Sequence, residues 1–171
     1  GFYQDWEPIL FAAKKLKDTN IEFWIIGEGA KKEFLIKEVE KHNLTNIKVL
    51  PYQDRELMPL INSFADIHFI SINKEMEQEG FPSKVYTIMA CSKPMIVITG
   101  ENTPLYNFLK PLNCSILISN NRNEEFVHSM TELANNESKK QELAQNGYDI
   151  IQQYYTKEKV VAQYLNLFEN L

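Results

Sequence analysis

Short apolar runs alternate with amphipathic segments along most of this chain. The first segment, about 5–17, carries apolar residues such as Trp6, Ile9 and Ala13 at helical spacing and therefore predicts a helix. Compact apolar runs that predict buried strands follow at 21–26, 47–50, 65–72, 95–98 and 115–118. Helical patterns lie between these runs and continue after residue 124, with expected breaks at 135–138 and at Gly147.

The regular alternation of strands and helices predicts an α/β fold: a Rossmann-like, doubly wound parallel sheet with C-terminal helices. The run at 65–72 is apolar on both faces, which is typical of a strand in the middle of a parallel sheet. His68 within that run is expected to be a packed, hydrogen-bonded core residue. Ligands of such sheets bind outside the carboxyl ends of the strands, so we expect a site formed by the loops at 27–30, 51–54, 73–84 and 99–104.

The composition narrows the class of protein. With 171 residues, 44% of them hydrophobic and 24% charged, the chain is long enough for one globular domain. A net charge of −5 argues against nucleic acid as a partner. No apolar run has the length of a membrane span, and the two cysteines, Cys91 and Cys114, suggest neither a disulfide framework nor a zinc site. These features predict a cytoplasmic protein.

The stretch 79–97 is the strongest candidate for chemistry. Glu79 lies on a turn, Pro82 and Ser83 are placed to begin a helix, with Ser83 as its cap, and Lys84 adds a positive charge at the helix start. A carboxylate before the turn and a cation after it suit a ligand with both hydroxyls and phosphates, such as a nucleotide-sugar. A nicotinamide cofactor is disfavoured, because Lys32 stands where a dinucleotide fingerprint would need its third glycine.

Four segments resemble those of one enzyme family: Gly27-Glu28-Gly29, residues 46–53, Ala65-Asp66-Ile67 and residues 79–94. Their pattern is similar to the C-terminal, donor-binding half of a GT-B fold, family-four (group 1) retaining glycosyltransferase. The Phe-Pro-Ser-Lys form at 81–84 resembles a subgroup that acts in capsule, O-antigen or exopolysaccharide assembly. The family usually has a second glutamate eight positions after the first, and here that position is Thr87.

The resemblance implies a role for each part of the predicted site. Glu79 would be the catalytic-site carboxylate that contacts the hydroxyls of the donor sugar. Backbone groups around Phe81, Pro82 and Ser83, together with Lys84, would hold the pyrophosphate. The nucleoside end would be held by residues from three segments: Thr87 at the ribose, Leu50, Pro51 and Tyr52 around the base, and Gly27 and Gly29 where the backbone approaches closely.

The resemblance also implies that residues 1–171 form a single nucleotide-sugar-binding domain and are a fragment of a longer enzyme. The N-terminal acceptor domain and the first strand would then be absent, and Gly1 to Gln4 resemble the end of the family's first loop. The acceptor would be a saccharide or a lipid-linked saccharide, with possible peripheral contact to the inner face of the membrane. No metal and no cofactor other than the donor substrate is expected.

Two other functions share this fold class. A nucleotide-sugar 2-epimerase has GT-B architecture, although it would need acid–base carboxylates and histidines that the loops do not offer in clear positions. A non-catalytic GT-B-like partner subunit is suggested by Thr87 standing where glutamate is usual. For single residues there are plainer interpretations: Glu79 as one of several solvated charges, Lys84 as a surface lysine, and Thr87 as a structural residue.

Overall fold

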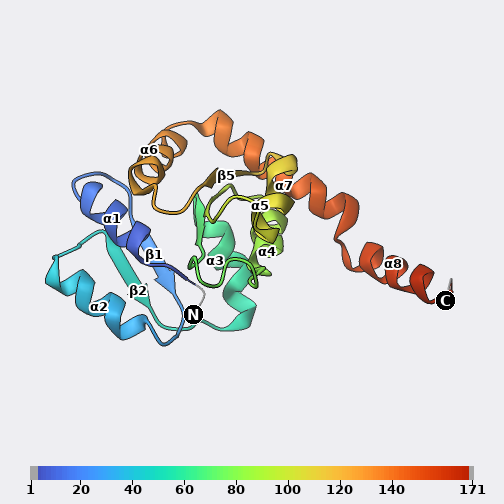
Figure 1. Cartoon of the computed structure of the whole chain (residues 1–171), viewed down its shortest axis with the longest axis horizontal. Helices are drawn as coiled ribbons and strands as arrows, with labels where there is room; N and C mark the ends of the chain where they lie inside the picture. The colour runs from blue at the N-terminus through green and yellow to red at the C-terminus, as the bar shows by residue number, and fades with distance from the viewer. Residues whose placement is uncertain (1–3, 170–171) are drawn as a thin grey trace.

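The computed structural model describes residues 4–169, which form an α/β fold of short parallel strands and α-helices (Figure 1). The first half contains α1 (Glu7–Lys15), β1 (Phe23–Ile26), α2 (Lys32–Lys41), β2 (Ile47–Leu50), η1 (Arg55–Leu57), α3 (Met58–Phe64) and β3 (His68–Ser71). The second half contains α4 (Lys84–Ala90), β4 (Met95–Ile98), α5 (Pro104–Leu109), η2 (Lys110–Leu112), β5 (Ser115–Ile118), α6 (Asn123–Ala134), α7 (Glu137–Tyr154) and α8 (Lys157–Glu169).

The strands form two parallel ladders. Strand β1 pairs with β2, in a register that places Phe23 beside Ile47 and Ile26 beside Leu50. The second ladder has the order β3-β4-β5. The prediction that the strand at 65–72 lies in the middle of its sheet is wrong for the described residues: β4 is the middle strand, and only there are all four positions buried. The partly buried residues of β3 reflect its place at the end of the ladder.

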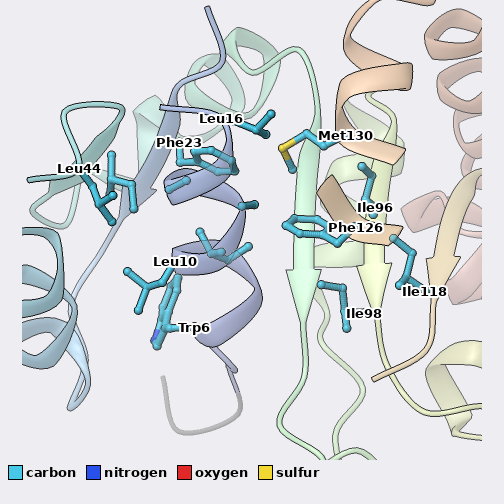
Figure 2. Packing of buried hydrophobic residues seen from close by; sticks show 14 of the residues in the cluster. Trp6, Leu10, Leu16, Phe23, Leu44, Ile96, Ile98, Ile118, Phe126 and Met130 are labelled. Atoms are coloured by element: carbon cyan, nitrogen blue, oxygen red, sulfur yellow. The ribbon is translucent and has the colours of Figure 1, made fainter. Parts of the chain in front are cut away.

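A continuous hydrophobic cluster joins the two ladders on one face. Ile9, Ala12 and Ala13 of α1 are fully buried in it, and the two alanines allow the helix to approach its neighbours closely. Figure 2 shows α1 side chains beside Phe23 of β1 and, across the cluster, Phe126 and Met130 of α6. Because α1 is in the same cluster as residues of both ladders, it fixes one ladder relative to the other.

The opposite face of the β3-β4-β5 ladder is covered by α4, α5 and α7, which make the fold doubly wound as predicted. Their buried residues include Val85, Met89 and Ile151. The sequence predicts a helix break at Gly147, and this is wrong, because Gly147 lies inside α7. A Cβ at this position would lie 3.2 Å from Cγ of Met89, so the glycine serves close packing between α7 and α4 rather than a turn. The break predicted at 135–138 is confirmed between α6 and α7.

The last helix extends away from the body of the molecule (Figure 1). None of the residues of α8 is buried, and Tyr164, Leu165 and Phe168 are each more than half exposed, at 60%, 56% and 69%. Among the described residues, no helix combines the length and the apolar character that crossing a membrane requires.

We expect that Phe126→Ala will destabilise the fold strongly. The ring is fully buried against both β4 and α1, and truncating such a phenylalanine lowers the free energy of unfolding by about 3–5 kcal/mol. The measurement is chemical denaturation followed by circular dichroism. Phe34→Ala, at a position in α2 that is 52% exposed, is the matched control and should change the stability little. Equal losses in the two variants would contradict the assignment of this core.

Candidate functional site

The loops at the carboxyl ends of the strands form two groups. The first group joins the loops after β1 and β2, where the Glu28 carboxylate accepts a hydrogen bond from Lys32 Nζ at 2.6 Å. It also accepts one from the backbone N–H of Tyr52, and both contacts, that of Lys32 being the larger, hold the pKa of Glu28 below its usual value. Tyr52 itself is 65% exposed. Of the two residues before it, Leu50 is partly exposed and Pro51 is exposed.

Gly27 and Gly29 lie in the same group of loops. Gly27 has φ of +133°, a conformation that side chains rarely adopt, and no atom lies within 4 Å of a Cβ built there. The backbone conformation therefore requires glycine at position 27, and the space that a side chain would fill there is open. A small cavity of about 60 Å³ adjoins this turn and is lined by Trp6, Ile25 and Val49 besides the turn itself. Gly29 is exposed.

The second group joins the loops after β3, β4 and β5. Residues 73–80 fold into a tight turn in which the N–H groups of Met76 and Gly80 donate to the carbonyls of Asn73 and Met76, each at 2.9 Å. Glu77 reaches from this turn to the backbone N–H of Gly100 at 2.8 Å and to the side-chain amide of Asn120. These contacts were not expected from the sequence, in which Glu77 is one of several charges in an acidic loop.

Phe81 follows this turn and packs into a cluster of aromatic rings. Its ring centroid lies 5.2 Å from that of Phe108 in α5 and 5.7 Å from that of Tyr86 in α4. Tyr155, after α7, contacts both Tyr86 and Phe108. The side chain of Phe81 therefore anchors the end of the loop against α4 and α5.

Glu79 lies between these two anchors, in the exposed part of the loop. Its carboxylate makes no hydrogen bond or ion pair with any residue in the described part of the chain. The predicted helix start needs a correction. Ser83 is the N-cap of α4, but its side chain accepts no capping hydrogen bond, and Pro82 precedes the cap instead of opening the helix. The Ser83 backbone is already helical, with φ −57° and ψ −20°, a conformation that differs from the extended one usual for capping.

Lys84 is the first residue of α4 and has no partner for its charge among residues 4–169. The residue is exposed at the surface, yet the protein that surrounds its ammonium group lowers its pKa to about 8 by desolvation. Thr87, one turn later, is also exposed, and its side chain makes no hydrogen bond in the described structure. Desolvation lowers the pKa of His68 as well, and the charge of Lys84 contributes to this shift.

His68 lies in β3 with Nε2 at 2.8 Å from the carbonyl oxygen of Asn62, so the expected hydrogen bond is present, while the side chain is only half-buried and not a full member of the core. A broader surface hollow, lined by Phe11 and residues 121–125, contains none of the predicted site residues. Across the described residues, no three His, Cys, Asp or Glu side chains gather as ligands for a metal ion would.

The first described residues run between the two groups of loops. The Asp5 N–H donates to the Ser71 carbonyl at 3.3 Å, and Lys31 Nζ donates to the Gln4 carbonyl at 3.2 Å. The structure places the predicted site residues at the end of β2, in the loops that follow β1, β2 and β3 or, for Lys84 and Thr87, in the first turn of α4. It joins Tyr52 to the turn of Gly27 and Gly29, and it places Glu79, Ser83 and Lys84 on a separate, adjacent segment.

Comparison with known protein families shows the family of the chain. The profile of the family "Glycosyl transferases group 1" matches residues 3–150. The chain belongs to the group 1 glycosyltransferases. The family expected from the sequence is thereby confirmed.

Individual glycosyltransferases are similar to the chain in sequence and in fold. WcaI of Escherichia coli K12, assigned as a colanic acid biosynthesis glycosyl transferase, is 27% identical over 105 residues, which is 61% of this chain and 26% of WcaI. The crystal structure of Anabaena HepE in complex with UDP-glucose has a TM-score of 0.77 and 16% identity, over 96% of this chain and 45% of HepE. The C-terminal domain of the group 1 protein LpcC from Francisella tularensis has a TM-score of 0.68 and 19% identity, over 88% of this chain and 78% of that domain.

The chain spans about a quarter of the length of WcaI and less than half of HepE. The LpcC domain is of similar size, and its match shows that the two share a fold. The predicted GT-B half, with its Rossmann-like architecture, is confirmed by these structural relatives.

We expect that Lys84→Met will stabilise the fold at pH 7. The folded-state pKa of Lys84 is about 8 and the ordinary value is 10.5, so the unfolded chain holds the proton more tightly. Stability should therefore rise with pH between these values, and the gain in the variant should be full below pH 8 and lost as the pH approaches 10.5. Thermal unfolding at pH 7 and pH 10 measures this.

Lys74→Met is the control, because Lys74 is an exposed lysine of the neighbouring loop without a partner among the described residues. This substitution also removes one positive charge, but from a lysine that is not desolvated. The melting temperature of the Lys74→Met variant should therefore stay near that of the wild type. A lower melting temperature for Lys84→Met than for Lys74→Met at pH 7 would refute this account of Lys84.

Proposed function

We propose that this chain is the donor-binding domain of a group 1 glycosyltransferase and holds a nucleotide-sugar at the carboxyl edge of its sheets. The observation that carries the proposal is the pair Glu79 and Lys84, a carboxylate and a desolvated ammonium five residues apart, neither of which has a partner in the described structure. The whole enzyme would transfer the sugar, with retention of configuration, to a saccharide or lipid-linked acceptor bound by another domain.

Lys84 is suited to hold the pyrophosphate. An ammonium group without a counter-ion, already stripped of part of its hydration, loses little when it contacts an anion and gains a charge-assisted hydrogen bond. The same contact would stabilise the negative charge that develops on the leaving nucleoside diphosphate during transfer. The backbone N–H groups of Phe81 and Ser83 lie next to Lys84 in the chain and would donate to the same phosphates, while Pro82, which has no N–H, would set the course of the backbone between them.

Glu79 is suited to bind the sugar. A carboxylate accepts hydrogen bonds from two adjacent hydroxyls, and Glu79 has its full acceptor capacity available. The nucleoside would extend toward the other group of loops, with the base near Leu50, Pro51 and Tyr52. Gly27 and Gly29 leave room for it beside the turn, and the exposed Thr87 hydroxyl would contact the ribose.

The relatives support this assignment. HepE, which has a similar fold, was crystallised with UDP-glucose, and WcaI is assigned to colanic acid biosynthesis. We therefore place the whole enzyme in cell-surface polysaccharide synthesis, in the cytoplasm and in peripheral contact with the inner face of the membrane where the acceptor is lipid-linked. The donor serves as substrate, and the proposed mechanism requires no metal or further cofactor.

The 2-epimerase alternative requires acid–base groups near the donor sugar. His68 is the histidine nearest to Glu79 in sequence, and its Nε2 is engaged with the carbonyl oxygen of Asn62. A non-catalytic partner subunit would keep nucleotide binding without transfer. Incubation of the full-length protein with a bound donor and an acceptor extract distinguishes the three functions, since they yield a glycoside, a 2-epimer or no product.

We expect saturable binding of one nucleoside diphosphate in a calorimetric panel of UDP, GDP, ADP and their sugars. Lys84→Met should lower the affinity about tenfold or more, because a hydrogen bond to a charged phosphate is lost. The affinity of the wild type should also fall between pH 7 and pH 9 as Lys84 loses its proton near pH 8, and the variant should lack this dependence. Lys74→Met should bind like the wild type, and an equal loss there would point to a general effect of charge.

We expect that Glu79→Ala will remove the gain in affinity that the sugar adds to the nucleotide. Binding of the nucleoside diphosphate itself should change little, because the carboxylate contacts the hexose and not the phosphates. Glu75→Ala, in the same loop, is the matched control. If Glu79→Ala weakens the nucleotide and the nucleotide-sugar by the same factor, the carboxylate is not at the sugar.

A further inference from the structure

Residues 73–80, which we name the donor loop, have few hydrogen bonds to the rest of the described fold. Their backbone hydrogen bonds close the turn on itself, as do the bonds from Met76 to Asn73 and from Gly80 to Met76. In the described part of the chain, both hydrogen bonds that link the donor loop to other elements are made by the carboxylate of Glu77. One oxygen, Oε2, accepts from the Gly100 N–H and from the Asn120 amide.

The partners of Glu77 are themselves held firmly. The Gly100 carbonyl accepts a hydrogen bond from the Thr103 hydroxyl at 3.0 Å, and that hydroxyl also lies 3.1 Å from the hydroxyl of Thr99. Both threonines are fully buried. Gly100 lies two residues after the end of β4, and Asn120 lies two residues after the end of β5. Glu77 is therefore hydrogen-bonded to the segments that follow two neighbouring strands of one ladder.

Gly100 is shaped to receive this carboxylate. A Cβ built on Gly100 would lie 2.5 Å from Oε1 of Glu77, a distance that no real contact allows. The backbone of Gly100 does not have positive φ, so the absence of a side chain here serves space and not conformation. Glu77 and Gly100 therefore form one fitted contact.

We infer that Glu77 is a positioning residue that holds the donor loop so that Glu79 faces the sugar. The inference rests on the proposed function, because it assigns a purpose to the orientation of Glu79. Glu79 lies two residues after Glu77, and the ring of Phe81 is anchored two residues further on in the aromatic cluster. The loop is thus fixed on both sides of Glu79 while Glu79 itself stays free for a ligand.

The first experiment tests the contact independently of any ligand. Hydrogen exchange of the amides of Met76, Glu79 and Gly80 is compared in the wild type, Glu77→Ala and Glu77→Gln. We expect exchange to become about tenfold faster in Glu77→Ala, because the bonds that tie the turn to the ladder are lost. Glu77→Gln should restore much of the protection, since its carbonyl oxygen can accept from both donors. Unchanged exchange in Glu77→Ala overturns the inference.

Gly100→Ala supplies a matched double-mutant cycle. Alone, it should displace the Glu77 carboxylate and speed exchange in the donor loop about as much as Glu77→Ala does. In the Glu77→Ala background it should add almost nothing, since the clashing group is gone. Additive effects of the two substitutions would show that they act at separate places, which contradicts the fitted contact.

The second experiment uses the full-length protein and measures the affinity for the nucleoside diphosphate and for its sugar. Glu77→Ala should lose the sugar's contribution, as Glu79→Ala does, and the double variant should be no worse than either single one. Glu75→Ala should behave like the wild type, and melting temperatures should be similar in the wild type and all four variants. If Glu77→Ala and Glu75→Ala have the same affinity for the nucleoside diphosphate and also the same affinity for the nucleotide-sugar, the positioning role of Glu77 is overturned. If the wild type binds no nucleotide, the proposed function fails, while the exchange experiment still decides the contact.

Discussion

The packing of α1 across both ladders is the contact on which the rest of the fold depends. Hydrogen bonds hold each ladder together, but in the described residues no strand pairing connects β1-β2 to β3-β4-β5. The connection is hydrophobic: Ile9, Ala12 and Ala13 lie in one dry cluster with Phe23 on one side and Phe126 on the other. Because buried apolar packing tolerates little displacement, this helix also sets the distance between the two groups of loops at the carboxyl edge.

The two groups of loops are built differently, and the difference suits a ligand with two chemically distinct ends. The turn at Gly27 lies directly on strand β1 and is reinforced by the contact of Glu28 with Lys32 and Tyr52. The donor loop is longer and is tied to its ladder through Glu77 and, beyond it, through Phe81. Under the proposed function, the firm turn after β1 would suit the base and the longer, tethered donor loop would suit the sugar.

Much of this architecture could be predicted from apolar periodicity alone. The strands at 47–50, 95–98 and 115–118 have the predicted bounds. Each is a compact apolar run between two helical patterns, and such a run is typical of a buried strand in a parallel sheet. Gly147 was mistaken for a break, since the sequence does not reveal that Met89 presses against it from another helix. The place of β3 in its ladder could not be predicted either, because strand order is a property of tertiary structure.

The residues of the candidate site also divide into those that the sequence could predict and those that it could not. Glu79 and Lys84 stand out in sequence because the turn and helix around them are local features. Glu77 does not, because its partners Gly100 and Asn120 are 23 and 43 residues away and its own neighbours are also charged. The one local signal was a glycine just after a buried strand, which often marks a place that another group approaches closely.

Thr87 bears on the electrostatics of the site through Lys84. The two residues are three positions apart on α4, a spacing at which side chains of opposite charge pair on a helix surface. A glutamate at position 87 could therefore give Lys84 a counter-ion and favour its charged form. Threonine offers no charge, and the ammonium stays unpaired, with its pKa lowered to about 8 by desolvation. Within the described residues no partner offsets the cost of the unpaired lysine, so under the proposed function the threonine at position 87 would make a phosphate contact of Lys84 more important.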